Sequence, residues 1–302
     1  MIAGKFKPYY FYRYILWKLG NRSPISAVLK VTQRCNLKCK HCPWPQGNKD
    51  IPFRKWKNLI KDARSRGCIL CIIEGGEPLL RKDLNKLITY AKNEGMLVSV
   101  ITNGTCNLSY YNPDMFWISI DGVGKTHEKI RGRGTFKRLI KNIEQNKDKK
   151  KIALVTLSKI NIHDIENICK FFSPLVNGIW FNFIYPYRSV EKISLNRVER
   201  INAAKTIYLL RPKYKIINSE SFLKLVGRKH SCFPWLTLNI SADGEIHHGC
   251  TVEQLEPCYC DNCDMSCYGE LTQAFNLNMD AVQFLQKSLG LKSSKLLFLK
   301  KA

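Results

Sequence analysis

The sequence predicts an α/β fold, namely a partial (β/α)6 barrel of the TIM type followed by a small cysteine-rich C-terminal extension. Short apolar runs alternate with amphipathic stretches between residues 27 and 185, and six of the thirteen cysteines lie beyond residue 231. Strands that alternate with helices form right-handed βαβ units, and therefore a parallel sheet or a partial barrel. With 302 residues, the chain can bury one large core or two modest ones.

Six strands are expected in this barrel, at residues 27–32, 68–74, 97–102, 115–121, 152–157 and 178–185. The second of them is almost continuously apolar, which is typical of a strand covered on both faces of a parallel sheet. Apolar periodicity predicts helices at residues 52–66, 84–95, 136–143, 165–172 and 195–210. Asp50 is placed to cap the first of these helices, and Gly95 to end the second.

The chain is expected to consist of five parts: a basic–aromatic segment (1–22), the barrel core (23–186), a helical connection (187–231), the cysteine-rich extension (232–270) and a C-terminal tail (271–302). Inside the extension, two strands joined by a turn at Asp243 and Gly244 are predicted to form a hairpin. The returning strand of this hairpin would deliver Cys250.

The formal net charge is +25, and the basic residues are spread along the whole chain. Such a charge favours anionic partners, namely nucleic acid, an acidic membrane surface or a phosphorylated substrate. Solvated lysine-rich faces would give the same count. Because no recognised nucleic-acid-binding motif accompanies the charge, a nucleic-acid partner is disfavoured.

Neither a secretory signal nor an apolar run long enough to span a bilayer is expected in this sequence. We therefore expect a cytoplasmic protein in a reducing compartment, where clustered cysteines indicate metal or redox chemistry more often than disulfides. The odd number of cysteines also argues against a framework built only of disulfides.

Three closely spaced cysteines follow the first predicted strand: Cys35, Cys39 and Cys42. The segments after the next three strands, EGGEP (74–78), TNGT (102–105) and SIDG (119–122), would lie at the same carboxyl edge, where βα barrels carry their reactive groups. Thiolates bind zinc or iron–sulfur clusters, and three of them leave an iron coordination site open for an exchangeable ligand. Zinc with His41 as a fourth ligand is the alternative.

The Cys-x3-Cys-x2-Cys loop and the Gly-Gly-Glu-Pro turn together resemble the radical S-adenosylmethionine (radical SAM) superfamily, over roughly residues 27–185. The resemblance implies that the three cysteines bind a [4Fe–4S] cluster whose unique iron chelates the amine and carboxylate of S-adenosylmethionine. It also implies a low-potential electron donor, and a 5′-deoxyadenosyl radical that abstracts a hydrogen atom from the substrate. A non-catalytic iron–sulfur electron carrier or metal-binding scaffold is the alternative, but it would have no use for the Gly-Gly-Glu-Pro turn.

By the same resemblance, seven residues contact S-adenosylmethionine: Gly75, Gly76, Glu77, Pro78, Ser119, Asp121 and Arg131. The glycines would let the backbone approach the ligand, and Glu77 would accept from its ammonium, although a tight strand–helix turn would look the same. Ser119 and Asp121 match the ribose contacts of the family, unless Asp121 caps the next segment. Arg131 would pair with the methionine carboxylate or remain in solvent. His41 occupies a position near adenine, where packing is expected rather than ligation.

The extension contains six further cysteines: Cys232, Cys250, Cys258, Cys260, Cys263 and Cys267. They resemble the SPASM or twitch extensions of radical SAM enzymes, which bind auxiliary iron–sulfur clusters, although the last cysteine block is compressed. Six thiols would hold one auxiliary [4Fe–4S] cluster with two to spare, or two clusters with shared or non-cysteine ligands, and zinc knuckles are the alternative. The remaining cysteines are expected to be ordinary buried thiols: Cys68, Cys71, Cys106 and Cys169.

Residues 5–22 interleave aromatic with basic side chains, and residues 296–301 are similar in kind. Such a segment is either a helix that closes the open barrel, with its lysines in solvent, or an anchor at an anionic membrane surface. A lipid substrate and a peripheral position at the inner face of the membrane would suit the second interpretation. The SPASM-like extension instead suggests a peptide or protein substrate.

Overall fold

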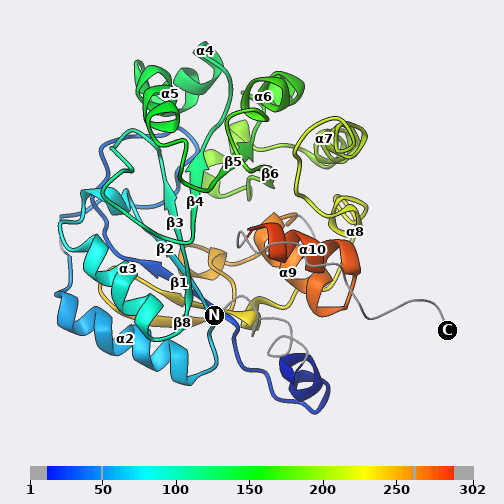
Figure 1. Ribbon diagram of the computed structural model, residues 1–302. Helices are drawn as coiled ribbons and strands as arrows, with labels where there is room; N and C mark the ends of the chain where they lie inside the picture. Colours follow the sequence, from blue (N-terminus) through cyan, green and yellow to red (C-terminus); the bar gives the residue numbers. More distant parts are fainter. Residues whose placement is uncertain (1–11, 49, 261–262, 289–302) are drawn as a thin grey trace.

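The computed structural model describes residues 12–48, 50–260 and 263–288, which form a curved eight-stranded sheet surrounded by helices (Figure 1). The strands are β1 (Ser26–Lys30), β2 (Leu70–Glu74), β3 (Leu97–Thr102), β4 (Met115–Ser119), β5 (Lys151–Leu157), β6 (Gly178–Phe183), β7 (Thr237–Ile240) and β8 (Ile246–His248). Their spatial order is β6-β5-β4-β3-β2-β1-β7-β8. Strands β1 to β6 pair in parallel with their sequence neighbours, and the two outer strands leave the sheet open. The predicted partial barrel is confirmed.

Helices follow the strands around the outside of the sheet (Figure 1). The α-helices are α2 (Phe53–Ser65), α3 (Leu84–Asn93), α4 (Lys125–Arg131), α5 (Thr135–Gln145), α6 (Ile165–Phe172), α7 (Arg197–Leu210), α8 (Glu220–Leu223), α9 (Ser266–Phe275) and α10 (Met279–Ser288). Short 3-10 turns are η1 (Pro78–Leu80), η2 (Ile162–Asp164), η3 (Arg188–Ile193), η4 (Pro234–Leu236) and η5 (Val252–Gln254). The apolar stripes predicted from the sequence face the sheet: Trp56, Leu87, Leu139 and Phe172 are completely buried in one core. The short helix α4 was not predicted.

The predicted hairpin at Asp243 and Gly244 is present, and it extends the main sheet. β7 pairs in parallel with β1, and β8 returns antiparallel to β7. Gly244 has a φ of +89°, which favours glycine, and its N–H donates to Ser241 O at 2.9 Å. The beginning of the cysteine-rich extension therefore lies against the first strand of the barrel.

The amino-terminal ends of the strands are covered by the last two described helices. A second apolar core joins Leu97 and Met115, which begin β3 and β4, to Phe275 of α9 and Phe284 of α10. These helices close one end of the barrel, so a site for ligands is left at the opposite, carboxyl end of the strands.

Asp50 does not cap the first predicted helix, and that prediction was wrong. The N-cap of α2 is Pro52, which has no side chain able to accept a hydrogen bond. Asp50 instead accepts from the Thr32 hydroxyl at 2.6 Å and forms an ion pair with Arg34. Because these two partners immediately precede Cys35, the carboxylate fixes the start of the cysteine loop.

The N-terminal segment is described only from residue 12, and residues 12–18 are helical. Trp17 packs with ring centroids 5.4 Å from Phe233 and 5.9 Å from Phe275, so the helix lies against the C-terminal part of the chain. Residues 5–11 and 296–301, which carry the rest of the predicted aromatic–basic pattern, lie outside the described residues. Among the helices that the structure describes, none has the length and apolar character needed to cross a membrane.

Candidate active site

A cavity of about 510 Å³ lies at the carboxyl ends of the barrel strands. Each of the six barrel strands contributes a residue from its carboxyl end to the lining: Lys30, Glu74, Thr102, Ser119, Thr156 and Asn182. The β7–β8 hairpin forms another wall through Asp243, Glu245 and His247. This is the edge at which parallel barrels place their reactive groups, as the sequence predicts.

The cavity gathers most of the residues predicted to bind the cluster and S-adenosylmethionine. Those that line it are Cys35, Cys39, Cys42, Gly75, Gly76, Ser119 and Arg131. Glu77, Pro78 and Asp121 are buried and do not line it. The six cysteines of the extension also lie outside the lining.

The three cysteines of the loop have mutually interacting thiols. Burial raises the pKa of Cys39 to about 11 and raises that of Cys35, and the thiol of Cys42 raises both further. Three neighbouring thiols fit a soft metal, which binds thiolates and displaces their protons. Within residues 12–48, 50–260 and 263–288, however, no three His, Cys, Asp or Glu side chains already converge as metal ligands.

The two glycines of the Gly-Gly-Glu-Pro turn are required by contact with the cysteine loop. A Cβ on Gly75 would lie 2.4 Å from Thr32 O, and one on Gly76 would lie 2.3 Å from Arg34 O. The turn is also hydrogen-bonded to that segment, because Gly76 N donates to Thr32 O at 2.8 Å. The turn after β2 and the beginning of the cysteine loop therefore form one packed unit at the cavity wall.

Glu77 uses its carboxylate to join that unit to the end of β3. The Thr102 hydroxyl donates to Oε1 at 2.8 Å, and the Asn103 N–H donates to Oε2 at 2.7 Å. Leu79 N–H donates to Oε1 at 3.1 Å. Burial raises the pKa of Glu77, and these hydrogen bonds oppose the rise. The predicted contact of Glu77 with the methionine ammonium stays a prediction, because its oxygens already have internal partners.

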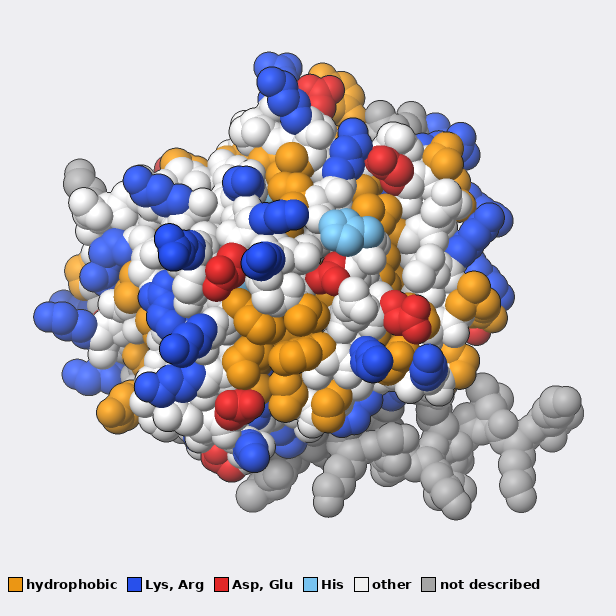
Figure 2. Space-filling model, turned by 90° about the horizontal axis from the view of Figure 1, so that it is seen from above, with side chains coloured by type: hydrophobic (Ala, Val, Ile, Leu, Met, Phe, Trp, Pro, Cys, Tyr) orange, Lys and Arg blue, Asp and Glu red, His pale blue; other side chains and the backbone are white. Residues whose placement is uncertain are grey.

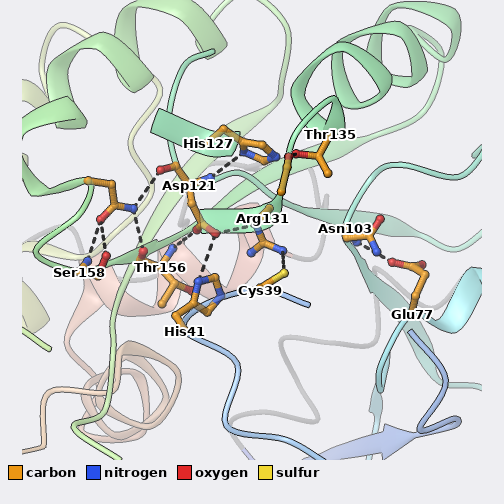
Figure 3. A network of polar contacts seen from close by, with 12 residues as sticks. Cys39, His41, Glu77, Asn103, Asp121, His127, Arg131, Thr135, Thr156 and Ser158 are labelled. Carbon is orange, nitrogen blue, oxygen red and sulfur yellow. Dashed lines mark hydrogen bonds and ion pairs between the residues drawn. The ribbon is translucent and has the colours of Figure 1, made fainter. Parts of the chain in front are cut away.

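Asp121 and Arg131 form a buried ion pair behind the cysteine loop (Figure 3). Arg131 Nε donates to Asp121 Oδ2 at 2.6 Å, and its Nη1 lies 3.8 Å from Cys39 Sγ. The other oxygen of Asp121 accepts from Thr156 N at 3.0 Å. Although burial opposes ionisation, Arg131 holds the pKa of Asp121 below its usual value. Arg131 is therefore not a solvated arginine, and Asp121 positions it rather than capping a helix.

His41 lies against the same pair (Figure 3). Its Nδ1 is 3.6 Å from Asp121 Oδ2 and has no hydrogen-bond partner in the described part of the chain. Burial lowers the pKa of His41 to about 4, so the ring is neutral at physiological pH. Its placement in the cavity wall agrees with the expected packing role.

The cysteines of the extension lie near one another beside the cavity. Cys258 Sγ and Cys260 Sγ are 3.7 Å apart, and Cys258 also interacts with the thiols of Cys250 and Cys263. Burial, and then Cys250 and Cys232, raise the pKa of Cys267. Residues 261 and 262 of this region lie outside the described residues.

The structure places two tyrosines between the extension and the cavity. Tyr185 and Tyr187 line the cavity with ring centroids 4.8 Å apart, and they share an apolar cluster with Cys250, Cys258 and Cys263. Of the four thiols predicted to be ordinary buried ones, Cys68, Cys71 and Cys169 are completely buried in the main core. The prediction was wrong for Cys106, which is only half-buried and packs against the edge of that core.

Sequence reasoning missed Lys30 and Glu74, which face the cavity from adjacent positions on β1 and β2. Burial lowers the pKa of Lys30 to about 8 and raises that of Glu74. The sequence did contain a signal for both residues, because each is a charged residue at the end of a largely apolar strand.

Comparison with known proteins agrees with this site. Residues 29–172 match the Radical SAM superfamily. The chain is 35% identical over 164 residues to Fe-coproporphyrin III synthase of Methanosarcina barkeri. The aligned region covers 49% of this chain and 40% of that protein. It is also 31% identical over 160 residues to the antilisterial bacteriocin subtilosin biosynthesis protein AlbA of Bacillus subtilis. That aligned region covers 47% of this chain and 36% of AlbA. The chain thus spans well under half the length of these relatives.

Solved structures share the fold. Streptococcus suis SuiB bound to S-adenosylmethionine matches with a TM-score of 0.66 and 16% identity, covering 87% of this chain and 66% of that one. Native anSMEcpe with bound AdoMet and Cp18Cys peptide matches with a TM-score of 0.60 and 15% identity, and the match covers 88% of this chain and 84% of that one. Residues 29–172, which contain the cysteine loop and the glycine turn packed on it at the carboxyl edge of the barrel, form a domain of the Radical SAM superfamily.

Proposed function

We propose that this radical SAM enzyme abstracts a hydrogen atom from a peptide or protein substrate bound in the cavity. The observation that carries the proposal is the presence of Cys35, Cys39 and Cys42 in one cavity wall together with the glycine turn and Arg131. The cofactors expected of the family are a [4Fe–4S] cluster and S-adenosylmethionine, which when bound supply a 5′-deoxyadenosyl radical. A low-potential electron donor would be the partner protein.

Arg131 would orient the methionine part of S-adenosylmethionine. Its guanidinium is held at one edge by Asp121 and reaches Cys39 at the other, and it lines the cavity. Buried and pre-oriented in this way, it can donate to a carboxylate without first being ordered. Ser119, at the end of β4, presents a hydroxyl to the same cavity and would contact the ribose.

The glycine turn would provide the backbone surface against which the ligand lies. Gly75 and Gly76 present no side chains to the cavity, and their packing on residues 32–34 fixes the turn relative to the cysteine loop. Glu77 positions this turn by its hydrogen bonds to the end of β3. Side chains of the chain itself therefore hold the ligand-binding elements in place.

The six cysteines of the extension would bind an auxiliary [4Fe–4S] cluster. Their thiols lie near one another, and Tyr185 and Tyr187 separate them from the cavity. A cluster in this place would stand next to a bound substrate, where it could exchange an electron with it. Which four thiols serve as ligands is part of the proposal to be tested by substitution.

A peptide substrate is supported by what several relatives act on. One relative is a PqqA peptide cyclase of Xanthomonas oryzae, 34% identical over 85 residues, and SuiB has been solved bound to the precursor peptide SuiA. A lipid substrate at a membrane surface was the other interpretation of the sequence. The packing of Trp17 against Phe233 and Phe275 supports the docked-helix interpretation of the N-terminal segment.

The proposal is tested by release of 5′-deoxyadenosine. Protein reconstituted anaerobically with iron and sulfide, then given dithionite and S-adenosylmethionine, should release it, and the triple variant Cys35→Ala, Cys39→Ala, Cys42→Ala should not. Cys169→Ala, which changes a buried thiol of α6 that does not line the cavity, is the matched control and should retain the activity. Undiminished release from the triple variant would refute the assignment, and methionine without 5′-deoxyadenosine would indicate a different transfer reaction.

A further inference from the structure

Lys30 places a buried ammonium group at the wall of the cavity. It is the last residue of β1, and only 8% of its surface is exposed. Its Nζ lies 3.1 Å from the ring centroid of Trp44, 3.1 Å from Gln254 Oε1 and 3.3 Å from Thr251 Oγ1. All three of these partners are neutral, so the groups in direct contact with the ammonium are dipoles and a ring, and no carboxylate of the described residues touches it.

No carboxylate of the described residues lies within ion-pair distance of Lys30, although the more distant carboxylate of Glu74 acts on its charge. Arg131, the guanidinium of the same cavity, is paired with Asp121 at 2.6 Å, whereas Lys30 takes part in no ion pair in this part of the chain. Glu74 lies across from it on β2 and lines the same cavity. It is too distant for an ion pair, but it raises the pKa of Lys30 and so offsets part of the cost of burial. Burying a charge without an ion-pair partner in contact with it is costly, and such groups in clefts mark functional sites.

A second donor beside Lys30, the side-chain amide of Gln254, has no partner within the described residues. Gln254 must turn Oε1 towards Lys30, because an ammonium can only donate, and this leaves its amide Nε2 buried without an acceptor. Gln254 lines the cavity as well. An anion with two oxygens would accept from Lys30 Nζ and from Gln254 Nε2 at once, so the pair has the donors that a carboxylate needs.

The position of this donor pair fits a substrate better than a structural ion. Trp44 belongs to the segment that follows Cys42, and Thr251 follows Cys250, so Lys30 lies between the two cysteine loops. The net charge of +25 would attract acidic ligands to the molecule, and Lys and Arg side chains are spread over the face shown in Figure 2.

We infer that Lys30 and Gln254 bind a carboxylate of the substrate, and that the substrate is a peptide with an acidic residue in the segment that enters the cavity. This inference rests on the proposed function, because it takes the occupant of the cavity to be a peptide. Glu74 remains available to accept from an N–H of the same peptide.

The test selects short random peptides, displayed on their encoding mRNA, on the immobilised and anaerobically reconstituted protein. Peptides bound by the wild-type protein should be enriched in Asp or Glu at one position. For a selected peptide, replacing that residue by Asn or Gln should weaken binding roughly ten-fold. Lys30→Met should abolish the acidic preference, Lys30→Arg should retain it, and Lys61→Met, the same change at an exposed position of α2, should leave it intact.

Gln254→Leu keeps the net charge and removes only the second donor, so it should weaken the acidic preference even if Lys30→Met does not fold. Selected peptides without an acidic position, or the same preference in Lys30→Met as in Lys61→Met, would overturn the inference but leave the proposed function standing. If no peptide is selected, both fail. If Lys30→Met lowers the affinity for S-adenosylmethionine and leaves peptide selection unchanged, the carboxylate belongs to that cofactor, and the inference is wrong.

Discussion

Two fully buried carboxylates show, at the scale of single residues, how surroundings determine charge. Asp121 lies beside Arg131, which outweighs the effect of burial and keeps the pKa of Asp121 below its ordinary value. Within the described residues no cation acts on Glu270 of α9: Oε1 accepts from Ser219 N at 2.9 Å, and Oε2 has no partner there. Burial raises the pKa of Glu270 to about 8. Asp121 is therefore ionised at neutral pH and pairs with Arg131, whereas Glu270 keeps its proton.

Glu270→Gln should therefore change how stability depends on pH. In the unfolded chain Glu270 ionises near 4.5, whereas the folded chain keeps its proton up to about 8, so its contribution to stability is complete below pH 4.5 and is lost as pH rises to 8. Each unit of pKa difference corresponds to about 1.4 kcal/mol. The variant should be the more stable protein above pH 8, and its melting temperature should fall less between about pH 5 and about pH 8. The exposed control Glu144→Gln should follow the wild-type profile, and parallel profiles for all three proteins would contradict the assignment.

The spacing of residues in the sequence was sufficient to predict which side chains of a single loop lie together in the site. Cys35, Cys39 and Cys42 line the cavity as the motif indicates. The partners of Glu77, and the donor pair of Lys30 and Gln254, could not be predicted because each joins strand ends or loops that are distant in the sequence. Which residues meet in these contacts depends on the order of the strands in the sheet, and a local sequence pattern does not predict that order.

At the scale of elements, the turn after β2 is packed against the beginning of the cysteine loop. Gly76→Ala would place a Cβ 2.3 Å from the backbone oxygen of Arg34, which cannot move without shifting Cys35. We expect this variant to lose iron from the loop cluster after reconstitution, down to about half of the wild-type content or less. Gly47→Ala is the matched control, because the closest atom to its Cβ is the flexible end of the Gln33 side chain rather than a backbone atom. Equal iron contents in the two variants would show that the contact does not support the loop.

The alternation of strands and helices predicted β1 to β6, but it could not predict where the hairpin of the extension pairs. β7 lies beside β1 although more than half of the chain separates them, and its pairing partner leaves no trace in the local sequence. The error at Asp50 has the same origin. Its carboxylate suits a helix cap, but Thr32 and Arg34, from the other end of a loop, bind it instead.

At the scale of the whole molecule, the N-terminal helix and the C-terminal helices pack at the same end of the barrel. Trp17 joins the apolar core that contains Phe275 and Phe284. Trp17→Ala should lower the free energy of unfolding by about 2 kcal/mol, because it removes aromatic packing from that core. Tyr12→Ala, at a side chain 54% exposed on the same helix, should change it by less than about 0.5 kcal/mol. Similar values for both in chemical denaturation would mean that the helix is not docked in solution.

The central claim is that Cys35, Cys39 and Cys42 hold a cluster that binds S-adenosylmethionine, separately from the metal held by the extension. The most direct measurement is the electron paramagnetic resonance spectrum of the reduced protein before and after S-adenosylmethionine is added. We expect a signal that changes on addition. The triple variant Cys35→Ala, Cys39→Ala, Cys42→Ala should keep roughly four irons per chain and a signal that S-adenosylmethionine does not alter. A wild-type spectrum unaffected by S-adenosylmethionine, or a responsive signal that survives in the triple variant, would contradict the central claim.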